Sequence, residues 1–199
     1  MKKINDKGFT LIELLAVIVI MGILMMVAIP AVSRTIENSR KDTFVDVAKQ
    51  YANQVKTLWA ADGLECKPLT ETDESKYVVS SAVEAGTADV PKAYYVVIDT
   101  ANSSDYPVLL EQGGKSSWGN KDVTGYVKVT VVASGDRVKT DYFVALSDGT
   151  HAIKATNNPK RGSVSSATGT DSAVADVSTE FNKVKKGANT ANTYTCREA

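Results

Sequence analysis

Residues 7–30 read KGFTLIELLAVIVIMGILMMVAIP, and this stretch decides the fold of the chain. The twenty residues from Leu14 to Ser33 carry no charge, and a helix of that length can cross the hydrocarbon core of a membrane. One carboxylate, Glu13, stands directly before them. Because an ionised carboxylate in hydrocarbon costs at least about 2.5–3.5 kcal/mol, Glu13 is expected to have a partner or a function.

The charges before this stretch predict its orientation. Lys2, Lys3 and Lys7, with Asp6, give residues 1–8 a side-chain balance of +2. The positive-inside rule therefore keeps residues 1–8 in the cytoplasm and sends the chain from Arg34 onward across the membrane. A conventional cleavable signal fits less well, because "AIPAVS" at 28–33 is a poor cleavage site and follows a long apolar run. A plain single-pass anchor remains an alternative.

The helical period continues beyond the apolar run. Apolar residues recur at spacings of three and four and form one stripe, made of Phe44, Val47, Tyr51, Val55 and Leu58. We predict one helix over residues 9–60, about 78 Å long at 1.5 Å per residue, whose second half is covered on one side by its own domain. Pro30 removes one backbone donor, so we expect a kink or a loosened turn between Gly22 and Pro30. Gly63 is suited to end the helix region.

The remainder of the chain has a β pattern. Short β-rich runs occupy residues 77–80, 93–98 and 106–111, and the runs 126–132 and 138–146 flank a hairpin turn, followed by a further run at 150–154. Residues 155–173 are predicted to form a surface loop, and residues 174–186 a short helix with Val177, Phe181 and Val184 on one face. The predicted class is α+β, a long N-terminal helix (transmembrane first half, amphipathic second half) packed on an antiparallel sheet.

The stretch 7–30 resembles the N-terminal segment of type IV prepilins and related pseudopilins, which carry a class III signal. A short basic leader ends in Gly8, Phe9 follows, a glutamate stands five places into the mature chain, and a long apolar helix has a proline near its end. The resemblance is strong over about the first 60 residues and covers only the general layout beyond them. It divides the chain into a leader (1–8), a transmembrane or filament-core helix (9–33), an amphipathic helix (34–62) and a β-rich head (63–199).

The resemblance implies roles for three residues. Gly8 precedes the bond that a prepilin peptidase cuts, and Phe9 becomes a new N-terminus that is N-methylated. Cleavage creates an ammonium one helical turn from Glu13, and a neighbouring subunit shifted along a filament axis can bring its own Phe9 amine against Glu13. In a core of low dielectric constant such a pair favours one axial register, so Glu13 is interpreted as a registration residue. The alternative is an interfacial charge that reaches the lipid headgroups.

The function implied is that of a structural subunit of a type IV pilus, a helical homopolymer that serves adhesion, motility or DNA uptake. The subunit would lie in the cytoplasmic membrane before assembly and on the bacterial surface afterwards. The sequence contains no Gly-rich phosphate loop, so assembly would need a platform and a separate ATPase. The alternatives are a pseudopilin of a type II secretion or competence system, a monomeric membrane-anchored adhesin and, disfavoured by the lack of catalytic motifs, an exported enzyme.

Few residues indicate other chemistry. Cys66 and Cys196 lie in the exported part and could form a disulfide across about 130 residues, or remain two thiols. His151 is the only histidine, and no metal or cofactor site is expected. Twenty-three basic residues balance twenty-three acidic ones, so nucleic acid binding by bulk charge is not indicated. A basic set near the C-terminus could form a patch for DNA or a host surface, but a solvated face is expected; its members are Lys160, Arg161, Lys183, Lys185 and Lys186. Trp59 and Trp118 are expected to serve packing.

Overall fold

The structure is a computed structural model that describes residues 9–61, 66–68, 92–102, 109–110, 112–134, 137–167, 173–184 and 194–196. The chain falls into two units, residues 1–39 and 40–199, and we refer to the second as the head domain. The helix α1 (Leu11–Ala60) contributes to both units and is assigned as α-helix through Pro30. The single helix predicted over residues 9–60 is therefore confirmed, with its start at Leu11 and not at residue 9, while the kink stays a prediction.

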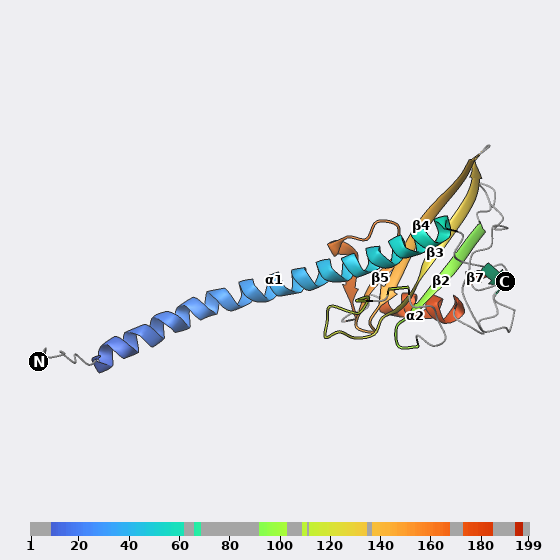
Figure 1. Cartoon of the computed structure of the whole chain (residues 1–199). Coiled ribbons are helices and arrows are strands. Elements are labelled where there is room, and N and C mark those ends of the chain that lie inside the picture. The colour runs from blue at the N-terminus through green and yellow to red at the C-terminus, as the bar shows by residue number, and fades with distance from the viewer. Residues whose placement is uncertain are drawn as a thin grey trace, which may run out of the picture. The chain divides into compact units, whose positions relative to one another are not determined.

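The head domain contains a seven-stranded sheet in its described part (Figure 1). The spatial order is β1-β7-β2-β3-β4-β5-β6. All neighbouring strands are antiparallel except β2 and β7, which are parallel. The strands are β1 (Cys66–Pro68), β2 (Lys92–Asp99), β3 (Thr124–Ser134), β4 (Arg137–Ser147), β5 (His151–Thr156), β6 (Val164–Ser166) and β7 (Tyr194–Cys196).

Alternation along the strands gives the sheet two apolar faces, because successive side chains of a strand point to opposite sides. One face packs against the stripe of α1, of which Phe44, Val47, Tyr51 and Val55 are buried as predicted and Leu58 is partly buried. On β3 this face presents Val127, Val129 and Val131. The other face packs against α2 (Ala173–Val184), whose Val177, Phe181 and Val184 are buried as predicted. Burying each such side chain stabilises the domain by about 1.5–3 kcal/mol.

Gly125 allows β3 and β4 to lie close together. It stands opposite Leu146 in the antiparallel pair. A Cβ at position 125 would lie 2.1 Å from the Ala145 carbonyl oxygen, a distance that no side chain tolerates. The strand pair at the centre of the sheet therefore requires glycine at this position.

Two local predictions for the head domain are wrong. Residues 106–111 were expected to form a strand; of these the structure describes Leu109 and Leu110, neither of which is in a strand, and Leu109 is buried in the core. Residues 155–173 were expected to form only a loop, but they contain the 3-10 helix η1 (Arg161–Ser163) and β6. Tertiary packing overrides the local pattern at both places: β6 pairs with β5, and its Val164 is buried against the α1 face of the sheet. The predicted strand at 77–80 lies outside the described residues.

The strands predicted at 93–98, 126–132, 138–146 and 150–154 correspond to β2, β3, β4 and β5 and are confirmed. The parallel pairing of β7 with β2 was not predicted. It places Tyr194 beside Tyr94 and brings a C-terminal segment between β1 and β2. In the β1–β7 pair, Cys66 stands directly opposite Cys196.

Candidate functional site

Two polar side chains, Thr10 and Glu13, cap the start of α1 directly before the apolar run. Glu13, in the first turn, accepts two hydrogen bonds on Oε2, from the Thr10 backbone N–H at 2.8 Å and from the Thr10 hydroxyl at 2.7 Å. The Glu13 N–H donates to the Thr10 hydroxyl oxygen at 3.4 Å. This reciprocal arrangement is a capping box, which satisfies backbone donors that a helix start leaves without partners.

The first part of α1 presents apolar side chains on all sides. Every described residue from Phe9 to Arg40 is exposed, with exposed fractions of 88% for Phe9, 77% for Met26 and 48% for Ile36. A Cβ added at Gly22 would meet no atom within 4 Å. An apolar surface of this extent exceeds what a soluble monomer exposes, so it marks contact with lipid or with other protein chains.

In the described part of the chain, one helix, α1, is long and apolar enough to span a membrane. The mean hydropathy of its most apolar 18 residues is 2.9. Phe9 precedes the helix and Thr10 is its first hydrogen-bonded residue. Gly8 lies outside the described residues. Glu13 and Thr10 are thus the polar side chains brought together at the start of α1.

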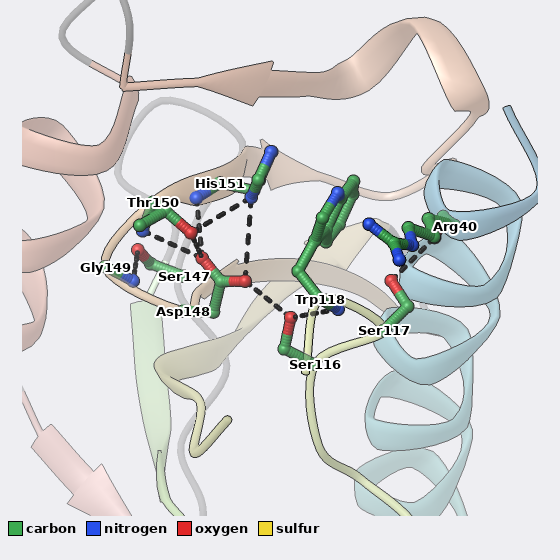
Figure 2. A network of polar contacts seen from close by, with 9 residues as sticks. All are labelled: Arg40, Ser116, Ser117, Trp118, Ser147, Asp148, Gly149, Thr150 and His151. Carbon is green, nitrogen blue, oxygen red and sulfur yellow. Dashed lines mark hydrogen bonds and ion pairs between the residues drawn. The ribbon is translucent and has the colours of Figure 1, made fainter. Parts of the chain in front are cut away.

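A second polar cluster lies in the head domain, around the turn between β4 and β5 (Figure 2). The Asp148 side chain is fully shielded from solvent. Its Oδ1 accepts bonds from the Thr150 N–H (2.8 Å), the Thr150 hydroxyl (2.8 Å) and the His151 N–H (2.6 Å), while Oδ2 accepts the Ser116 hydroxyl at 2.5 Å. Asp148 therefore joins the loop at residues 112–123 to the β4–β5 turn.

Hydrogen bonds stabilise the ionised form of the Asp148 carboxyl. Burial acts to raise its pKa, but the bonds from Ser116, His151 and Thr150 outweigh burial and lower the pKa below its usual value. Ser116, Asp148 and His151 are the residue types of a hydrolase triad, but the serine donates to the aspartate and not to the imidazole. The histidine cannot take the serine proton in this arrangement, so the cluster lacks the geometry of an activated nucleophile.

Among the residues that the structure describes, no group of three or more His, Cys, Asp or Glu side chains could hold a metal ion. An open pocket of about 320 Å³ lies between β5 and α2, where Lys154 and Asp176 form an ion pair at 3.0 Å. Trp59 and Trp118 pack as expected, Trp59 beside Tyr94 and Trp118 against Phe44 and His151. Arg161 is exposed, as expected, and forms a surface ion pair with Asp42; this pairing lowers the pKa of the Asp42 carboxyl.

Comparison with known proteins identifies the N-terminal segment. Residues 3–29 match the family model described as the prokaryotic N-terminal methylation motif. The type IV wide pilus major component PilA4 of Thermus thermophilus is 28% identical over 116 residues, which are 57% of this chain and 79% of PilA4. The fimbrial protein EcpC of Eikenella corrodens is 36% identical over an aligned length of 129 residues; the match covers 59% of this chain and 84% of EcpC.

The chain belongs to the type IV pilin family. No solved structure matches this pilin. The family model covers Gly8, Phe9, Glu13 and Gly22 of the pilin and ends one residue before Pro30. Its α+β fold, a long apolar N-terminal helix with an antiparallel sheet, agrees with the class predicted from the sequence.

Two functional features of the pilin were missed in the sequence. Thr10 and Glu13 have the spacing of a capping box directly before an apolar run, so the sequence contains the signal that predicts this cap. The Asp148 cluster had no such signal, because Ser116 and Asp148 are 32 residues apart. "SDG" at 147–149 indicated only a turn.

Proposed function

We propose that this pilin is processed and polymerised as a structural subunit of a type IV pilus. A prepilin peptidase cuts between Gly8 and Phe9 on the cytoplasmic side, and Phe9 is then N-methylated. The apolar part of α1 holds the subunit in the cytoplasmic membrane, and an assembly platform driven by a separate ATPase moves it into an extracellular helical homopolymer. One observation carries the proposal: the apolar part of α1, exposed on all sides, bears a single carboxylate, Glu13, one turn from the residue that becomes the N-terminus.

The exposed surface of α1 supports a transfer from lipid to a filament core. Both environments are apolar, so the transfer changes little hydrophobic free energy and can be reversible. Helix packing and charge pairing then stabilise the filament. The Phe9 ammonium of one subunit meets the Glu13 carboxylate of a neighbour, and this pair selects the axial register.

The capping box is compatible with a pair between Glu13 and the ammonium of a neighbouring subunit. Both bonds from Thr10 end on Oε2, which orients the carboxylate at the helix start and presents Oε1 to a second donor. A pair across two subunits therefore adds to the cap and does not have to replace it.

Gly8→Arg is expected to stop processing, because the peptidase subsite before the cut bond admits no side chain. The measurement is the N-terminal mass of the membrane-bound chain, which should retain residues 1–8. Asn5→Arg is the matched control, since it adds the same charge three residues upstream and should be cut normally. Arg at position 8 with a mature N-terminus at Phe9 would contradict the cleavage site.

Electron microscopy of the cells tests the pilus itself. Long surface fibres that contain this chain, with a methylated Phe9 at the N-terminus, are expected. Short assemblies confined to the cell envelope would overturn the pilus in favour of a pseudopilin. A monomer that keeps its leader would overturn polymerisation in favour of a membrane-anchored adhesin.

We also propose a disulfide between Cys66 and Cys196. Directly opposite residues of an antiparallel pair have Cα atoms about 4.5–5.5 Å apart, within the range that a disulfide spans. Cys66→Ser is expected to lower the stability of the β1–β7 pair by about 2–5 kcal/mol, measured as faster proteolysis of the C-terminal tail. Cys196→Ser should have the same effect and the double variant no further one. Equal protease resistance of the wild type with and without reductant would contradict the bridge.

A further inference from the structure

Inside the head domain, the first covered side chains of α1 lie within about one turn of Arg40. Lys41 and Asp42 are half-buried, and Phe44 and Val45 are the first buried side chains of the helix, with exposed fractions of 0% and 3%. Three contacts from distant parts of the head domain converge on residues 40–44. One of them involves Phe44, the first residue of the apolar stripe, and the other two involve polar groups outside the stripe.

Two of the three contacts are polar. The Ser117 hydroxyl donates to the Arg40 carbonyl at 2.7 Å (Figure 2). The Arg161 guanidinium reaches Asp42 with two nitrogens: Nε donates to Oδ1 at 2.7 Å, and Nη2 donates to Oδ2. Two-pronged geometry is the stronger form of an arginine–carboxylate pair, although both side chains are about half exposed and solvent weakens the attraction.

The third contact is aromatic and links the helix to the sheet. The Phe44 ring packs edge-on against Trp118 with centroids 5.5 Å apart, and the same indole stacks on His151 with centroids 3.7 Å apart. Ser116, beside Ser117, is bonded to Asp148 in the β4–β5 turn. The loop that touches Arg40 and Phe44 is therefore fastened to β4 and β5 by its neighbouring residues (Figure 2).

We infer that these contacts form a clamp, made of Arg40, Asp42 and Phe44 on α1 with Ser117, Trp118 and Arg161, that stops local opening of α1 at the start of the head domain. A helix opens from its end by releasing successive carbonyls, and the Arg40 carbonyl accepts the N–H of residue 44. Opening past this point must break the Ser117 bond, the Arg161 pair and the buried Phe44 contact within little more than one turn. The free energy of opening therefore rises steeply over residues 40–44.

A clamp at this place lets the first part of α1 change conformation while the part inside the head domain stays helical. Residues before the clamp can change conformation when a subunit leaves lipid for a filament, while the head domain keeps its fold. This use of the clamp rests on the proposed function. The clamp itself is a property of the monomer and is tested on the monomer, so its failure is distinguishable from a failure to polymerise.

Hydrogen exchange of the full chain in detergent micelles, read by mass spectrometry, tests the clamp. In the Ser117→Ala/Arg161→Gln variant, amides of residues 41–48 are expected to exchange about tenfold faster or more, since one hydrogen bond and one ion pair are lost there. Amides of β3 should change less than about twofold, because a clamp affects local and not global opening.

The matched control is Thr57→Ala/Lys139→Gln, which also removes one hydroxyl-to-helix-carbonyl bond, from Thr57 to Asn53, and one ion pair, between Lys139 and Asp141. Its exchange at residues 41–48 should equal that of the wild type. Unchanged exchange at residues 41–48 in the clamp variant would overturn the inference. So would an equal rise in β3, or the same rise in the control, since either would reduce the clamp to ordinary domain stability.

Discussion

Glu13→Val is expected to leave the chain in the membrane and to reduce the mass of assembled fibres about tenfold or more. Removing one partner of a buried ion pair leaves the other charge uncompensated, which costs about 3–5 kcal/mol. In the proposed filament this cost falls at every subunit contact, because each Phe9 ammonium loses its carboxylate. Insertion should not suffer, since the substitution removes a charge from an apolar helix. Sheared fibres and the membrane fraction, quantified by immunoblot from the same cells, give the two measurements.

Two further variants separate the charge of Glu13 from its role in the cap. Glu13→Gln can still complete a capping box with Thr10 but carries no charge, so it should assemble as poorly as Glu13→Val. Thr10→Val keeps the charge and removes the hydroxyl bond of 2.7 Å, so it should reduce fibre mass much less. Normal fibres from Glu13→Gln would show that the carboxylate acts through helix capping and not through axial register.

The sequence predicted those elements whose own residues determine them. The stripe from Phe44 to Leu58 has the period of a helix, and the turn between β3 and β4 follows from "ASGDR" between two β-rich runs. β6 was missed because Val164 is the only apolar residue of its three, and the strand forms by pairing with β5. The parallel β2–β7 pair joins residues about 100 positions apart, which no local pattern reveals.

The candidate site divides in the same way. Gly8, Phe9 and Glu13 lie within six residues of one another in the sequence and form a recognisable motif, which the family model covers. The contacts of the head domain that converge on Arg40 and Asp42 come from Ser117 and Arg161, which are 77 and 119 residues distant. Such contacts depend on the completed sheet. Sequence patterns therefore identify the pilin from its helix, whereas the structure is needed to see how, inside the head domain, Ser117 and Arg161 contact residues 40–42 of α1.

The head domain also depends on Asp148, whose side chain is fully shielded and accepts four hydrogen bonds. Asp148→Ala leaves the hydroxyl of Ser116 and the N–H groups of Thr150 and His151 without their acceptor. Each buried donor left unpaired costs about 1–3 kcal/mol, and partial access of water reduces the sum, so a loss of about 2–4 kcal/mol in the free energy of unfolding is expected. The fluorescence of the chain's two tryptophans during urea unfolding in micelles measures this loss, because both are packed in the head domain and Trp118 stacks on His151.

The pH dependence of this loss gives the sharper measurement. The pKa of Asp148 is lowered in the folded chain, so its stabilising contribution is fully present above the unfolded value, about 3.9, and is lost as pH falls through the lower folded value. The stability gap between wild type and Asp148→Ala should be constant above about pH 5 and shrink below pH 4. Asp141→Ala removes a carboxylate from the surface pair with Lys139 and should cost at most about 1 kcal/mol. A gap for Asp148→Ala that stays constant down to pH 2, or that is no larger than that of Asp141→Ala, would contradict a hydrogen-bonded, ionised Asp148 at the centre of the β4–β5 turn.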